Sequence, residues 1–157
     1  MQINSIRGKQ KMNDLRDYVV QYLKNHQYAN MATIHATDPM QPHVSTVAYV
    51  NDGLNLYFVT SSKTHKVVNI EKNNKVALTI DEDEPDWMKL TGLQIEGKAS
   101  RVKAEDIMPI FEIYAEKFPI AKSFPVSPDD RFIRITPVKI CILDYRKGFA
   151  HRDYLEL

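Results

Sequence analysis

Apolar side chains recur with a helical period in three stretches of the chain. In residues 13–25 they share one helical face: Leu15, Tyr18, Val19, Tyr22 and Leu23. Asn13 stands just before them as a candidate N-cap. The same period marks residues 64–73 and residues 105–117, where Pro109 is tolerable only in the first turn. The pattern therefore predicts three helices.

Six other stretches are apolar or alternating over lengths typical of β-strands. They are residues 29–36, 43–50, 54–60, 75–80, 88–102 and 131–145, the last forming one or two strands. An Asp-Gly pair separates the second stretch from the third and is a strong hairpin signal. Gly92 and Gly97 predict bulges or close backbone approach, and Pro137 predicts an edge or a break.

The order of these elements predicts a mainly β fold. Sequential strands joined by short turns favour an antiparallel sheet of about six strands that closes toward a barrel, with flanking α-helices. A parallel doubly wound sheet needs a helix after nearly every strand, but the hairpin joins two strands with no helix between them. With 157 residues and no internal repeat, we expect a single domain over residues 1–157. Residues 1–27 would form a helical segment, and residues 28–157 the barrel with its helices.

Composition excludes several classes of function. The 21 basic and 20 acidic residues leave a net charge of +1, so no global field favours nucleic acid or a membrane. The single cysteine, Cys141, lies in an apolar run and is expected to be buried. No histidine or cysteine spacing fits a metal, and the acidic loop at 81–86 lacks calcium-loop features. Without a signal-peptide core or a span of ~20 apolar residues, we expect a cytoplasmic protein.

Polar chemistry is concentrated in residues 60–66, TSSKTHK, where a strand ends and a helix begins. The first turn of a helix exposes unpaired backbone N–H groups and carries partial positive charge. Four hydroxyls and two lysines surround it, so one interpretation is a phosphate site. The other is that Ser62 or Thr64 caps the helix and the lysines are solvated. The absence of glycine excludes a P-loop or a dinucleotide fingerprint.

A second polar feature interrupts the apolar strand HVSTVAYV at Ser45 and Thr46. On a barrel wall, these hydroxyls and the neighbouring backbone would meet a polar ligand edge. The alternative is that one hydroxyl faces water and the other bonds to backbone. The residues alone leave both interpretations open.

From about Tyr28 onward the chain resembles the pyridoxamine 5'-phosphate oxidase-like family, the FMN-binding split barrels. The resemblance is carried by order and spacing: a Gln-Pro strand, a hairpin, an aromatic-x-Thr strand end, and a helix opened by a hydroxyl and two basic residues. The Asn-rich EKNNKVALTI follows. The match continues through QIEGKASRV and IRITPVKICILDYRKGFAHRDYL.

The resemblance implies a split barrel that binds FMN. By position, the phosphate ligands are Thr60, Ser61, Thr64, His65 and Lys66, with Ser62 and Lys63 close by. The strand residues along the flavin ring and ribityl chain are Ser45, Thr46 and Val47. The resemblance also implies a homodimer with the cofactor at the subunit interface.

The sequence departs from the true oxidase, which has basic residues where Ser45, Val50 and His65 stand, and a tryptophan where Tyr145 stands. We therefore expect an FMN-dependent oxidoreductase with an unassigned small-molecule substrate or electron donor, and not a pyridoxine phosphate oxidase. No catalytic residue is assigned, because FMN supplies the redox chemistry. The alternative is a non-catalytic module in the same fold that binds flavin, deazaflavin or haem, or acts as a stress-related sensor.

Overall fold

The computed structural model describes residues 2–157, with side chains from residue 8 onward. In this part of the chain the α-helices are α1 (Gln2–Asn25), α2 (His65–Lys72) and α3 (Ile107–Lys117). The strands are β1 (Tyr28–Ile34), β2 (Pro42–Ala48), β3 (Val50–Asp52), β4 (Asn55–Ser61), β5 (Lys75–Asp81), β6 (Thr91–Arg101), β7 (Asp130–Asp144) and β8 (Arg152–Glu156). Short 3₁₀ helices lie in the connections: η1 (Trp87–Lys89), η2 (Ala104–Asp106), η3 (Pro119–Ser123) and η4 (Tyr145–Lys147).

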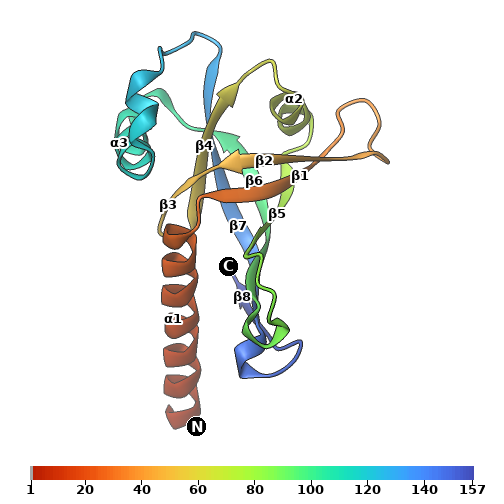
Figure 1. The fold of residues 1–157 in the computed structure, drawn as a ribbon, viewed down its shortest axis with the longest axis vertical. Helices are drawn as coiled ribbons and strands as arrows, with labels where there is room; N and C mark the ends of the chain where they lie inside the picture. The colour runs from red at the N-terminus through yellow and green to blue at the C-terminus, as the bar shows by residue number, and fades with distance from the viewer. Residues whose placement is uncertain (1) are drawn as a thin grey trace.

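The strands form one curled antiparallel sheet (Figure 1). Its order is β2-β1-β5-β6-β7-β4-β3, and β8 pairs with β7. β2 lies at one end of this order and contacts β4, near the other end, without forming a ladder with it. The sheet therefore curls into a barrel that is split between β2 and β4, and the expected mainly β split barrel with flanking helices is confirmed.

Two hydrophobic cores hold these elements together. The main core fills the barrel, and its fully buried side chains include Leu23, Met31, Phe58, Ile95 and Ile140. A second core lies outside β4, where Val50 and Tyr57 pack against Ile110 and Tyr114 of α3. The second core fixes α3 over the outer side of β4, because the burial of these side chains stabilises the contact by roughly 2 kcal/mol each.

The long strands β6 and β7 carry the irregularity that Gly97 and Pro137 predict. Their register shifts between Glu96 and Gly97, so a β-bulge lies there. Along its other side β7 pairs with β4 as far as Ile135 and with β8 from Lys139. Pro137 lies between these two partners, where no ladder on that side requires the N–H that proline lacks.

Gly97→Ala is expected to destabilise the fold. A Cβ at this position would lie 2.9 Å from Thr136 O and 3.1 Å from Ile135 Cγ2. Because β7 is paired on both sides, we expect the free energy of unfolding to fall by roughly 1 to 2 kcal/mol. Gly8→Ala is the matched control, since a Cβ there has nothing within 4 Å. Urea denaturation measures both variants, and an unchanged midpoint for Gly97→Ala would contradict the close approach.

Two differences from the sequence prediction concern the strands, which number eight in the described chain instead of about six. The stretch at 43–50 is split, because the N–H of Tyr49 donates to Gln27 O at 3.1 Å and its phenol donates to Leu23 O at 3.0 Å. Tyr49 therefore belongs to neither strand and separates β2, which pairs with β1, from β3, which pairs with β4. The second difference is β8, which was not predicted because its five residues are too short to show a clear period.

The start of α1 and the backbone at Gly92 also differ from the prediction. α1 begins at Gln2 rather than at residue 13. Residues 8–14 are all exposed, so they carry no apolar stripe from which a helix could be predicted. Gly92 pairs in regular register with Asp81 and marks no bulge. Pro109 does lie in the first turn of α3, as its missing N–H requires.

Several expectations from composition can be compared with the described residues. Cys141 is buried, as expected, at 7% exposure. The acidic loop before η1 is largely exposed to solvent. Over the described range, no group of three or more His, Cys, Asp or Glu side chains is placed to hold a metal ion. No helix within that range has both the length and the apolar character needed to cross a membrane.

Candidate functional site

β4 ends and α2 begins within residues 60–66, here called the β4–α2 junction. Thr64 is the N-cap residue of α2, with φ −75° and ψ 147°. Its hydroxyl donates to Ser61 O at 2.9 Å, and no side chain caps the helix. The backbone N–H groups of His65 and Lys66 find no acceptor among the described residues. The structure therefore contradicts the side-chain cap, and the first turn keeps donors for an anion.

Lys66, His65 and His43 lie together at the junction without a described carboxylate beside them. Lys66 is half-buried, and burial lowers the pKa of its ammonium group. The ring of His65 lies 5.7 Å from that of His43 on β2, measured between centroids. Among the described residues, none of these three side chains has a carboxylate oxygen within 4 Å. A bound anion would supply the missing negative charge.

Lys63, by contrast, is already paired. Its ammonium lies 2.6 Å from the carboxylate of Asp129, and its side chain is 77% exposed. The neighbouring Ser62 N–H donates to Asp129 O at 2.8 Å. These contacts hold the middle of the junction against the start of β7, so Lys63 is less available to a ligand than Lys66.

β2 brings one of its faces toward the junction. Side chains alternate along a strand, so Ser45 and Val47 share a face and Thr46 lies on the other. The hydroxyl of Ser45 is buried without a hydrogen-bond partner. Val47 is packed in the core at 6% exposure, so only its backbone is open to a ligand. Thr46 is exposed and donates to Asn30 Oδ1 at 3.1 Å. The structure thus brings Ser45, but not the Thr46 side chain, toward the junction.

His43 is a candidate site residue that the sequence reasoning missed. Asn69 Nδ2 on α2 donates to Thr33 Oγ1 at 3.0 Å, and that hydroxyl lies 3.4 Å from His43 Nδ1. These contacts orient the imidazole from one edge and leave Nε2 for another partner. A signal was present: His43 stands two positions before Ser45, so the period of a strand places both on one face.

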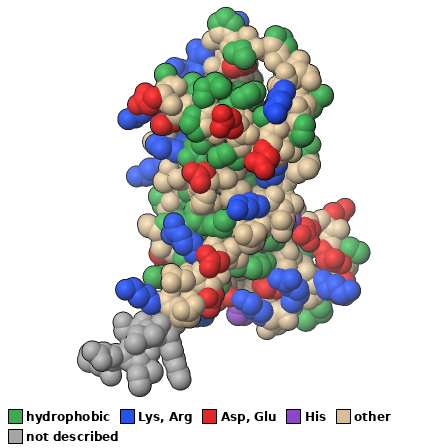
Figure 2. Space-filling model, turned by 90° about the vertical axis from the view of Figure 1, so that its left-hand side faces the viewer, with side chains coloured by type: hydrophobic (Ala, Val, Ile, Leu, Met, Phe, Trp, Pro, Cys, Tyr) green, Lys and Arg blue, Asp and Glu red, His purple; other side chains and the backbone are tan. Residues whose placement is uncertain are grey.

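An apolar cavity of about 650 Å³ lies outside β4, beneath α3 and η3, and is here called the α3 cavity. Aromatic side chains form much of its wall: Tyr28, Phe111, Tyr114, Phe118, Phe124 and Phe132. Two further lining residues adjoin the candidate site in sequence, because Ala48 follows Val47 and Val59 precedes Thr60. Figure 2 shows the side of the molecule that is on the left in Figure 1. Hydrophobic side chains are grouped in its upper half, at the height of α3.

Residues 15–143 match the protein family described as pyridoxamine 5'-phosphate oxidase. The match includes β2, the β4–α2 junction and nearly all of β7. The chain belongs to the pyridoxamine 5'-phosphate oxidase-like family. The resemblance carried by the order of strands, hairpin and helix is confirmed.

Individual relatives fit this membership. General stress protein 26 of Bacillus subtilis (strain 168) is 31% identical over 70 residues, covering 45% of this chain and 48% of that protein. The chain thus matches about half the length of this curated relative. A solved structure from Listeria innocua, named as a candidate pyridoxamine 5'-phosphate oxidase, is 27% identical with a TM-score of 0.68, covering 83% of this chain and 98% of that one. HutZ, the haem storage protein from Vibrio cholerae, shares the fold at 20% identity and a TM-score of 0.67, covering 78% of this chain and 89% of that one.

The residues at the junction fit a phosphate monoester, the group that FMN carries. A phosphate monoester carries up to two negative charges and accepts several hydrogen bonds. The junction offers the free N–H groups of His65 and Lys66 and the Lys66 ammonium. β2 adds the Ser45 hydroxyl, which is buried without a hydrogen-bond partner. Thr60 Oγ1 lies 3.5 Å from Thr64 Oγ1, whose own proton goes to Ser61 O, so the Thr60 hydroxyl is the one placed to add a donor.

Proposed function

We propose that this protein is a cytoplasmic homodimer that binds FMN and acts as a flavin-dependent oxidoreductase. One observation carries the proposal: free N–H groups, a half-buried lysine and two histidines meet at the β4–α2 junction, and no described carboxylate oxygen lies within 4 Å of these three side chains. Membership of the family supports the same assignment. Bound FMN would supply the hydride and electron transfer, and the protein would supply the pocket and its charge.

Each part of the chain has a defined task in this proposal. Thr60, Ser61, Thr64, His65 and Lys66 hold the phosphate, with Ser62 beside them and His43 added from β2. The ribityl chain and ring run along the backbone of Ser45, Thr46 and Val47. FMN binding through these residues needs no catalytic acid or base from the chain, and we assign none.

The substrate we propose is not pyridoxine phosphate. By resemblance, the true oxidase has a lysine where Val50 stands. Here Val50 is fully buried and packs with Tyr57, Ile110 and Tyr114 in the second core. A cation at this position would lose its hydration inside an apolar cluster. Where the true oxidase has a charged side chain, this chain has an apolar one that helps to pack α3 against the sheet.

A spectrum of the purified protein tests the cofactor. We expect yellow protein with flavin absorption bands and about one FMN per chain, identified by mass after release. A haem Soret band instead would favour the function named for HutZ. Colourless protein that takes up no added FMN would refute the proposal. Stopped-flow reduction by NADH or NADPH then separates an enzyme from a carrier, because a carrier's flavin stays oxidised.

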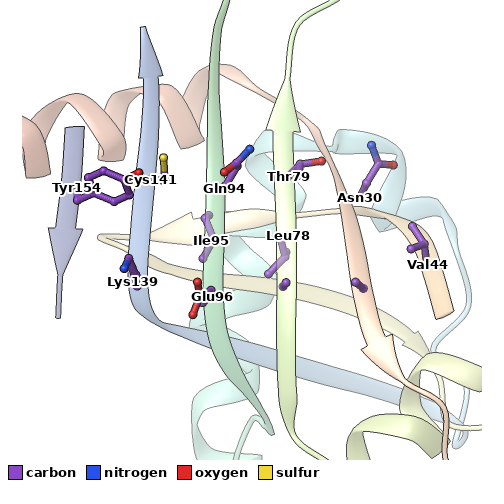
Figure 3. Close-up of a pocket in the computed structure, with 12 residues that line it drawn as sticks. Asn30, Val44, Leu78, Thr79, Gln94, Ile95, Glu96, Lys139, Cys141 and Tyr154 are labelled. Atoms are coloured by element: carbon purple, nitrogen blue, oxygen red, sulfur yellow. The ribbon is translucent and has the colours of Figure 1, made fainter. Parts of the chain in front are cut away.

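The proposed dimer face is the outer surface of β1, β5, β6, β7 and β8, where a shallow hollow of about 480 Å³ lies (Figure 3). Small or uncharged residues such as Ala77 and Thr79 line it, together with the charged Glu96 and Lys139. Tyr154 and Val44 stand at opposite sides and are 54% and 63% exposed. Such a face suits a second copy of itself, because two-fold symmetry pairs one patch with the same patch.

Ala77→Arg is expected to convert the dimer into a monomer. Ala77 is exposed in the hollow, directly across from Glu96 on β6, and two-fold symmetry would bring two bulky arginine side chains close together there. Size-exclusion chromatography with light scattering measures the mass. Lys75→Arg, on the same strand outside the hollow, keeps the charge and is the control. A dimeric Ala77→Arg protein would contradict this face.

A further inference from the structure

The lining of the α3 cavity includes one acidic residue and no basic residue. Fifteen residues line it, and Asp130 is the one charged residue among them. Its carboxylate accepts a hydrogen bond from Ser127 N at 2.8 Å, which fixes it at the edge of the cavity. A phosphorylated or carboxylated molecule would meet one negative group and no cation. The lining therefore disfavours anions.

Lys117, Lys122 and Arg131 each adjoin a lining residue in the sequence, but none of them lines the cavity. Lys117 ends α3, between the lining residues Tyr114 and Phe118. Its ammonium donates to Leu23 O at 3.1 Å and to His26 O at 2.5 Å, at the end of α1. Burial lowers the pKa of this ammonium to about 8. Lys117 thus ties α3 to α1, and no cationic side chain is among the residues that line the cavity.

The inner wall of the cavity is held in place. Tyr114 is buried, and its phenol donates to Ala48 O at 3.3 Å, which joins α3 to the end of β2. The rings of Tyr114 and Phe118 lie 5.1 Å apart at an angle of 41°. The outer rim is open, since Phe124 and Val126 are 66% and 88% exposed. A molecule can enter from this rim and meet a preformed aromatic wall.

We propose that the α3 cavity binds an uncharged, flat aromatic molecule. Its volume falls in the range of small-molecule sites, which bind through apolar and aromatic walls with few polar groups. Tilted and offset stacking on the rings described above suits a flat ligand. That this molecule is a substrate of the flavin rests on the proposed function; that the cavity binds it does not. The inference names an uncharged class of substrate, in contrast to the anionic pyridoxine phosphate.

Two fluorescent probes with the same rings test the charge preference. N-phenyl-1-naphthylamine is neutral, and 8-anilinonaphthalene-1-sulfonate adds one sulfonate. We expect one neutral probe to bind per chain, at least tenfold more tightly than the sulfonate. Asp130→Asn removes the single negative charge of the lining and keeps an oxygen that accepts from Ser127 N. The affinity of the sulfonate probe should therefore come closer to that of the neutral probe. Equal binding of both probes to the wild-type protein would overturn the inference.

Cavity-filling variants locate the probe. Ala121 is half-buried in η3 and lines the cavity, so Ala121→Trp should weaken binding of the neutral probe at least tenfold. Ala104→Trp is the matched control, because Ala104 is exposed in η2 and lies outside the lining. If circular dichroism shows Ala121→Trp unfolded, Phe124→Ser at the exposed rim replaces it with the same expected loss. Unchanged binding in the folded variant would refute the site.

An FMN titration keeps this inference distinct from the proposed function. Ala121→Trp should leave FMN affinity unchanged, and FMN should not displace the neutral probe. Displacement by FMN would show that the cavity holds the flavin ring, which overturns the inference and supports the proposed function. If the protein binds the neutral probe but takes up no FMN, the inference is supported and the proposed function is refuted.

Discussion

Thr60→Val combined with Lys66→Met should lower the affinity for FMN about 100-fold. The double variant removes one hydroxyl donor and one ammonium donor from the phosphate. Each charge-assisted hydrogen bond is worth about 1.5 kcal/mol or more, and 1.4 kcal/mol is a factor of ten. Isothermal titration of the apoprotein with FMN measures the change. The free protein should stay folded, because burial already disfavours the Lys66 ammonium.

Two controls separate phosphate binding from other effects. Riboflavin lacks the phosphate, so its affinity should be nearly equal for the double variant and the wild type. Lys63→Met removes a lysine that is already paired with Asp129 and should change FMN affinity less than threefold. A double variant that binds FMN as tightly as the wild type would place the phosphate away from the β4–α2 junction.

Asp153→Asn should destabilise the protein at neutral pH by roughly 2 kcal/mol. Asp153 is buried on β8, and hydrogen bonds from His151 Nε2 and Lys147 Nζ, both at 3.0 Å, lower the pKa of its carboxyl to about 2. In an unfolded chain the same group titrates at about 3.9. The folded state therefore binds this proton less readily, and the charged carboxylate stabilises the fold above about pH 4.

This stabilisation is lost as the pH falls from about 4 toward about 2, where the folded carboxylate takes up a proton. The difference between wild type and Asp153→Asn should shrink over that interval. Urea denaturation at a series of pH values measures it. Lys11→Met is the control, because Lys11 is 71% exposed and its 3.4 Å contact with Asp153 is worth little in solvent. A pH-independent difference would show that the asparagine acts through packing.

Local patterns in the sequence sufficed for much of the fold and for half of the candidate site. The Asp-Gly turn, Gly97 and Pro137 act through steric rules that involve only a few neighbouring residues. The junction was found because a strand end and a helix start lie side by side in the chain. Thr60 and Lys66 therefore needed no tertiary information to be chosen.

Other outcomes depend on contacts between distant residues. Tyr49 divides the predicted strand because it bonds to α1. Thr46 was chosen with Ser45, but the pleat puts its side chain on the opposite face. His43 joins the candidate site because the curled sheet brings β2 beside α2. No local period contains that information, since hydrophobic burial sets how the sheet closes.

The sequence by itself determined the antiparallel strands, the three helices and the β4–α2 junction, because hydrophobic period and turn chemistry are local properties of the chain. Tertiary structure alone decided which groups meet: His43 with His65, Asp153 with two lysines and a histidine, and six aromatic rings around the α3 cavity. The physical reason is that charge compensation and cavity shape arise only when packing brings distant segments within contact distance.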